Sequence, residues 1–154
     1  MTDITLRQAQ ELIARGEEKW QELDSKVAKA FARYNDTVSG EKFGNLYGRE
    51  YNSKTDKFDG NFVLLEYPVR FERLLYYVTE EFPAVYKRDA RTGKYRESKT
   101  AYKAIQACER AIDKAIDRRE YLEDTLDKCK KLLPKIEKRE RALDFLADVM
   151  EHVG

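Results

Sequence analysis

The chain has 154 residues, of which 38% are charged, with 29 acidic side chains against 30 basic ones. Apolar residues make up 42%, enough to bury a core, so the composition argues against disorder and favours one domain over residues 1–154 with long, solvated helices. A formal net charge of +1 argues against a dedicated nucleic-acid-binding domain, for which a high pI is expected.

The first predicted element is a helix over residues 5–36, which Asp3 or Thr5 can cap. Its apolar residues recur at alternating steps of three and four, which is the heptad pattern of a coiled coil. They are Leu6, Ala9, Ile13, Trp20, Leu23, Val27, Ala30 and Tyr34, with Gly16 in the remaining position. One face of this helix is therefore predicted to pack against another helix.

Residues 40–97 are predicted to form a small α+β head. In GEKFGNLYGREY, Phe43, Tyr47 and Tyr51 would share one face of a strand, because strand side chains alternate. The turn-rich NSKTDKFDGN and the strand candidate NFVLLEY complete a β-hairpin. The segment PVRFERLLYYVTEEF has apolar residues at helical spacing after a proline, which predicts a short helix.

The most basic part of the chain lies at 84–103, with seven Lys or Arg against two acids. Its RDARTGKYR has the form of a second hairpin, because Gly93 can adopt a positive φ. The candidate contact residues at this tip are Tyr86, Lys87, Arg88, Arg91, Lys94, Tyr95, Arg96 and Lys99. Such residues suit phosphates and bases, but Tyr and Arg are also favoured anchors of protein interfaces. A nucleic-acid contact, a protein contact and a solvated turn all stay open.

The last segment, residues 98–152, repeats the heptad as far as Pro134. Arg119 is the one charged residue on this seam, and a lone charge there commonly fixes register or partner choice. Pro134 is expected to kink or end the helix. A further helix follows over residues 136–152, and in a rival arrangement it folds back as the third member of a bundle. A second basic island spans residues 128–141.

Antiparallel pairing of the two heptads predicts a helical hairpin. The register chosen is the one in which paired residue numbers add to 135, because it pairs the helix ends nearest the connection. Large side chains then face small ones. In that register Trp20 faces Ala115, and Gly16 faces Arg119.

The sequence indicates no catalytic residue, no cofactor and no metal. Cys108 and Cys129 lie too far apart on one predicted helix for an intrachain disulfide, and no Cys or His pair has the spacing of zinc ligands. The single histidine, His152, sits where a helix end would fray. Without a signal segment or a run of about 18 apolar residues, we expect a cytoplasmic protein with reduced thiols and no membrane contact.

The sequence therefore predicts a mainly α (α+β) fold. It is an antiparallel long-helix coiled-coil hairpin or helical bundle, with a stalk of residues 5–36 and 98–152 and a β-hairpin and short-helix head at 40–97. The predicted function is that of a non-enzymatic protein-binding module, an adaptor or stoichiometric inhibitor of a larger complex, such as one that handles nucleic acid. The alternative is direct nucleic-acid binding through residues 86–103. A homodimer also stays open.

Overall fold

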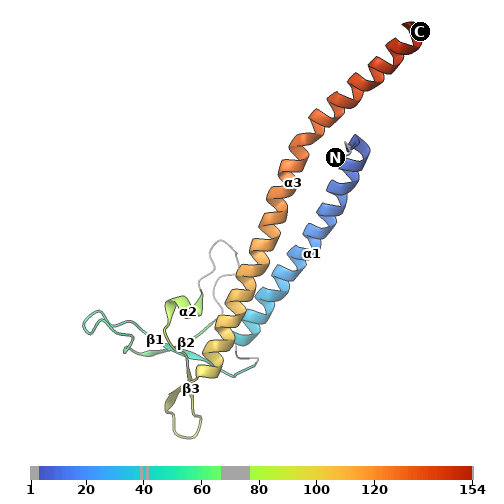
Figure 1. Cartoon of the computed structure of the whole chain (residues 1–154). Helices are drawn as coiled ribbons and strands as arrows, with labels where there is room; N and C mark the ends of the chain where they lie inside the picture. Colours follow the sequence, from blue (N-terminus) through green and yellow to red (C-terminus); the bar gives the residue numbers. More distant parts are fainter. Residues whose placement is uncertain (1–3, 39, 41, 67–76, 154) are drawn as a thin grey trace. The chain divides into compact units, whose positions relative to one another are not determined.

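The computed structural model describes residues 4–38, 40, 42–66 and 77–153 (Figure 1). The fold is mainly α with a small antiparallel sheet, as the sequence predicts. In chain order its elements are α1 (Leu6–Val38), β1 (Tyr47–Arg49), β2 (Phe62–Leu64), α2 (Val78–Glu81), β3 (Tyr86–Arg88), β4 (Tyr95–Glu97) and α3 (Lys99–Val153).

The chain forms two compact units. Unit 1 consists of Met1–Lys26 and Ile116–Gly154, and unit 2 of Val27–Ala115. Unit 1 therefore contains the first part of α1 and the last part of α3. Unit 2 contains the rest of both helices, together with the sheet and α2.

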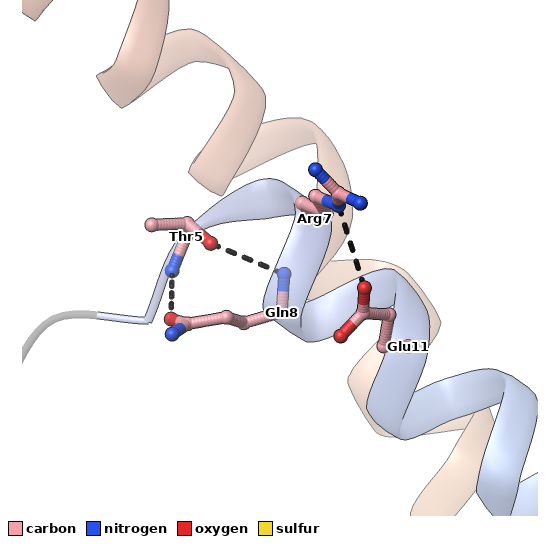
Figure 2. Close-up of polar contacts among 4 residues, drawn as sticks. All are labelled: Thr5, Arg7, Gln8 and Glu11. Atoms are coloured by element: carbon pink, nitrogen blue, oxygen red, sulfur yellow. Dashed lines mark hydrogen bonds and ion pairs between the residues drawn. The ribbon is translucent and has the colours of Figure 1, made fainter.

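In unit 1, α1 begins at a capping box formed by Thr5 and Gln8 (Figure 2). The Thr5 hydroxyl accepts a hydrogen bond from the Gln8 N–H at 3.1 Å, and the Gln8 side-chain oxygen accepts one from the Thr5 N–H at 3.0 Å. In the same part of the helix, Arg7 forms an ion pair at 3.4 Å with Glu11, one turn further along. The reciprocal bonds satisfy backbone donors that a helix start leaves unpaired, which confirms Thr5 as a cap.

The two helical segments of unit 1 run antiparallel, but in a register one heptad away from the predicted one. A Cβ placed on Gly16 would lie 2.5 Å from Leu126 Cδ2, so Gly16 faces Leu126, whereas the predicted register opposed it to Arg119. A shift of one heptad again sets seam residues against seam residues. The periodicity therefore fixes which faces meet, while the close fit of Leu126 over Gly16 distinguishes the registers.

Helix α3 continues through Pro134 and is a single helix of 55 residues. The further helix predicted after Pro134 is thus part of α3, and the rival arrangement in which residues 136–152 fold back on the others is wrong. Pro134 leaves the Lys130 carbonyl without its helical hydrogen bond. Both residues are exposed, so water can pair with that carbonyl and the helix persists.

Unit 2 contains a four-stranded antiparallel sheet with the strand order β2-β1-β3-β4. Both predicted hairpins are present, as β1–β2 and β3–β4, and Gly93 in the second turn has a φ of +72°. The pairing of Tyr47 with Tyr86 joins the two hairpins through their inner strands. Of the predicted short helix, the helical part among the described residues is α2, and residues 68–76 lie outside the described ones.

The core of unit 2 joins the sheet to the helices. Its fully buried side chains include Tyr34 and Val38 of α1, Leu46 and Val85 beside the strands, and Ile105 of α3. The Tyr34 hydroxyl accepts a hydrogen bond at 3.2 Å from the backbone N–H that begins α2. This bond satisfies a donor that so short a helix cannot pair internally.

Glu109 of α3 is a buried acid that also holds α2. Its carboxylate accepts hydrogen bonds from the Thr79 backbone N–H, at 3.0 Å, and from the Thr79 hydroxyl. Burial is the largest influence and raises the pKa of Glu109; the bonds from Thr79 lower it, and the charges of Glu80 and Asp113 raise it further.

The pKa of Glu109 predicts a pH-dependent effect of Glu109→Gln. Because the folded chain binds this proton more tightly than the unfolded chain, wild-type stability falls as pH rises through the folded pKa. Gln keeps an oxygen for the Thr79 N–H and carries no charge. We therefore compare the free energy of unfolding of Glu109→Gln with that of wild type at each pH by urea unfolding. The difference should favour the variant more at about pH 8 than at about pH 4. An equal difference at both pH values would contradict this account, and Glu120→Gln, at an exposed position, is the control.

Gly48 of β1 provides a second test, because it lies directly under the Phe82 ring. A Cβ at Gly48 would lie 2.5 Å from Phe82 Cδ1. We expect Gly48→Ala to lower the free energy of unfolding by about 1–3 kcal/mol, because a half-buried ring cannot simply move aside. In a Phe82→Leu background the same change should cost less. An equal cost in both backgrounds in urea titrations would show that the contact is unimportant.

Candidate binding surface on the β3–β4 hairpin

One face of the sheet carries four aromatic rings, from Tyr47, Phe62, Tyr86 and Tyr95. The strand register places them together, because side chains alternate and Tyr47 is paired with Tyr86. Phe62 stacks on Tyr95 with ring centroids 3.9 Å apart, and each of these two rings also has an edge contact with one of the inner-strand tyrosines. Since β2 and β4 are the outer strands, the sheet must curl toward this face for Phe62 and Tyr95 to meet.

The ring cluster is a small core of its own. All four rings are half-buried and packed on one another. Arg49 closes one side: its guanidinium lies 4.8 Å from the Phe62 centroid and donates hydrogen bonds to the carbonyls of Asp59 and Gly60, at 2.6 and 3.2 Å. Tyr86 and Tyr95 were predicted as contact residues, and the structure places both in this packed cluster.

The opposite face of the β3–β4 hairpin carries two cations side by side. Lys87 and Arg96 are directly paired across the strands, and both are exposed. Like charges directly opposite each other destabilise a sheet. Lys87 is also 5.6 Å from the centre of the Phe43 ring, and Lys42 approaches the same ring at 5.4 Å. Three cations and an aromatic ring therefore gather on this face.

A hollow of about 470 Å³ lies beside these cations, where β1 begins and β3 ends. Cations line it together with an amide side chain and two aromatic rings. The lining residues are Phe43, Gly44, Asn45, Tyr47, Lys87, Arg88 and Ala90. Cationic and amide donors beside aromatic rings can hold an anionic group such as a carboxylate or a phosphate.

The loop between β3 and β4 adds further positive charge. Arg91 and Lys94 are exposed there, and so is Lys99 at the start of α3. The acid in this loop, Asp89, accepts hydrogen bonds from the backbone N–H groups of Arg91 and Thr92, at 2.8 and 3.4 Å. Its carboxylate thus shapes the turn and, among the residues that the structure describes, forms no ion pair with a cationic side chain.

The predicted site residues divide into two groups. Tyr86 and Tyr95 are packed in the ring cluster, while the six basic residues are exposed around the hairpin. Within the described parts of the chain, none of those six forms an ion pair with an acid. Lys42, Phe43 and Asn45 were missed, because their approach to β3 depends on the pairing of distant strands. For the rest of this article, the basic hairpin means these six residues with Lys42.

Arg119, predicted as a specificity residue, lies in unit 1. Its side chain is only 10% exposed and forms an ion pair at 2.6 Å with Asp24, which is 45% exposed. Its guanidinium is also 5.9 Å from the Trp20 ring. A buried arginine needs such a partner, because an uncompensated charge away from water is costly. Selection of register by Arg119 stays a prediction.

The described residues offer little else for chemistry. They contain no group of three or more His, Cys, Asp or Glu able to hold a metal ion, and no helix among them is long and apolar enough to cross a membrane. Both cysteines are free; Cys108 is buried, with its sulfur 3.7 Å from the Thr37 hydroxyl. His152 is exposed on α3, with Nδ1 2.9 Å from the Asp148 carbonyl oxygen.

Comparison of the chain with protein-family models, with curated proteins and with solved structures found no match.

The ion pair of Arg119 predicts an asymmetric mutational effect. Asp24→Asn removes the charge of one partner of the buried guanidinium, and we expect a loss of about 1–2 kcal/mol in the free energy of unfolding. Arg119→Met removes the charge and keeps an apolar side chain of similar length, so it should cost less. Urea unfolding measures both, with the exposed Glu18→Gln as the control. A larger loss for Arg119→Met than for Asp24→Asn would refute this account of the pair.

Proposed function

We propose that the protein is a non-enzymatic binding module whose basic hairpin docks on an acidic surface of a partner protein. It would act as an adaptor or as a stoichiometric inhibitor of a larger assembly. The observation that carries the proposal is the exposed cross-strand pair of Lys87 and Arg96. A pair of like charges costs stability in the free chain, and acidic groups of a partner would relieve that cost.

The surroundings of the pair support a specific contact. The hollow lined by Phe43, Asn45, Lys87 and Arg88 offers shape, rings and hydrogen-bond donors next to the charges. A carboxylate could be held there by two cations while its aliphatic stem packs on a ring. Interfaces favour this combination of aromatic residues and arginine.

Nucleic-acid binding is the second candidate, because the same cations could neutralise phosphates and Phe43 lies among them. Proteins that bind single strands usually stack bases on free aromatic faces. Here the sheet's rings are packed on one another, with Phe62 stacked on Tyr95, which favours the protein partner.

Charge reversal tests the proposal with defined probes. The full-length chain and a Lys87→Glu/Arg96→Glu variant would be titrated against a fluorescent glutamate-rich peptide and a single-stranded oligonucleotide at low and moderate salt. We expect the peptide to bind and the double reversal to weaken it about tenfold or more, because two attractive contacts become repulsive. A Lys29→Glu/Lys114→Glu variant makes the same charge change at exposed positions outside the hairpin and should bind nearly as wild type does.

Each other outcome has a definite meaning. If only the oligonucleotide binds, with steep salt dependence, and the Lys87/Arg96 reversal abolishes that binding, the second candidate replaces the first. If neither probe binds, or if both double variants weaken binding equally, the hairpin is not a binding site.

A further inference from the structure

The last turns of α3 carry a broad apolar stripe that the described part of the chain leaves in solvent. Leu143 is 58% exposed, Phe145 71% and Met150 65%; Leu146 and Val149 are also exposed. In unit 1, α1 begins beside Arg139 and Glu140, the residues of α3 that come just before this stripe. There Arg139 donates a hydrogen bond to the Ile4 carbonyl, and the Glu140 carboxylate accepts one at 2.8 Å from the Leu6 N–H. Helix α3 continues beyond this point (Figure 1), and its residues 141–152 are all exposed.

Unit 1 also contains an apolar groove of about 350 Å³ between α1 and α3. From α3 it is lined by Leu122, Thr125, Leu126, Cys129, Leu132 and Ile136. The opposite wall comes from Ile4 and from the first turns of α1, including Leu12 and Gly16. Leu12 and Leu132 are each about half exposed, so the groove is open to a further apolar side chain.

The groove and the stripe lie on one continuous heptad seam of α3. From Leu122 the seam runs through alternating steps of three and four residues, and only one of its members is charged. Its positions are Leu122, Thr125, Cys129, Leu132, Ile136, Arg139, Leu143, Leu146 and Met150. Such a seam is typical of a helix that packs along its length on another helix. In this chain, α1 accompanies α3 only as far as Arg139 and Glu140.

The geometry points to a second copy of this chain as the occupant of the groove. A seam of alternating threes and fours maps onto itself when it is reversed, so two antiparallel copies of α3 can pair about a twofold axis between Ile136 and Arg139. Leu143 of each copy then meets Leu132 of the other, Leu146 meets Cys129, and Met150 meets Thr125. The stripe of each copy fills the groove of the other, and two of these three layers set a large side chain against a smaller one.

Charge favours this antiparallel arrangement over a parallel one. Residues 142–151 hold three acids, Asp144, Asp148 and Glu151, and no Lys or Arg. In the antiparallel pair they lie level with residues 124–133 of the other copy, which hold Lys128, Lys130 and Lys131 against Asp124 and Asp127. Asp144 of one copy is then level with Lys131 of the other. In a parallel pair, the acidic ends of the two copies would instead lie side by side and repel each other.

Light scattering coupled to size-exclusion chromatography tests the inference with the full chain. We expect a mass of two chains at micromolar concentration, and a mass of one chain for Leu146→Asp/Met150→Asp. Both positions are exposed, so the folded chain should tolerate the change, and circular dichroism would confirm that its helicity is kept. The charge-matched control is Arg141→Asp, off the seam, which changes the net charge by the same two units and should stay a dimer. A one-chain mass for wild type, or a two-chain mass for Leu146→Asp/Met150→Asp, would overturn the inference.

A cysteine placed on the stripe tests the register. Leu146→Cys should form a disulfide with Cys129 of the second copy under mild oxidation, giving a two-chain band on a non-reducing gel. These two residues are about 25 Å apart along one helix, so they cannot be bridged within a chain. Cys129→Ser in the same background should remove the band, and Asp148→Cys should not produce it. A band that persists without Cys129 would mean that the copies pair in another way.

Discussion

In unit 1, the side chain of Leu126 lies over Gly16, and this contact distinguishes the registers in which α1 can lie on α3. The other features of the unit follow from that register. It brings Arg119 to Asp24 and Trp20. The arginine forms an ion pair with Asp24, and its guanidinium lies beside the Trp20 ring. It also places the start of α1 beside Arg139 and Glu140, so that α3 continues alone past that point. In the predicted register, the start of α1 would lie one heptad earlier along α3. A longer part of the apolar stripe of α3 would then be uncovered.

The same kind of steric constraint organises unit 2. Gly48 admits the Phe82 ring on one face of the sheet, while the four rings from Tyr47, Phe62, Tyr86 and Tyr95 close the other. A sheet with strands of only three residues has few backbone hydrogen bonds, so its stability must come largely from these side chains. Because the tyrosines are committed to this packing, the exposed cations are left as the part of the hairpin available to a partner.

The sequence was informative wherever the deciding contacts are local. Heptad spacing identified both long helices and their packed faces, and Gly93 marked the turn of the second hairpin. The register was not predictable, because every heptad shift sets apolar positions against apolar positions again. The Tyr47–Tyr86 pairing that merges the hairpins is also long-range, and with it comes the approach of Phe43 and Asn45 to Lys87. Pro134 misled the prediction because its cost depends on exposure, which the sequence does not display.

The distribution of aromatic residues makes the two units spectroscopically distinct. The chain's single tryptophan, Trp20, belongs to unit 1, where it lies beside the buried Arg119. The stacked and edge-packed tyrosines belong to unit 2. Indole emission therefore follows the helix pair of unit 1, while the near-ultraviolet circular dichroism of the tyrosines follows mainly the sheet. Without any added label, one denaturation experiment can thus show whether the two units melt together or one after the other.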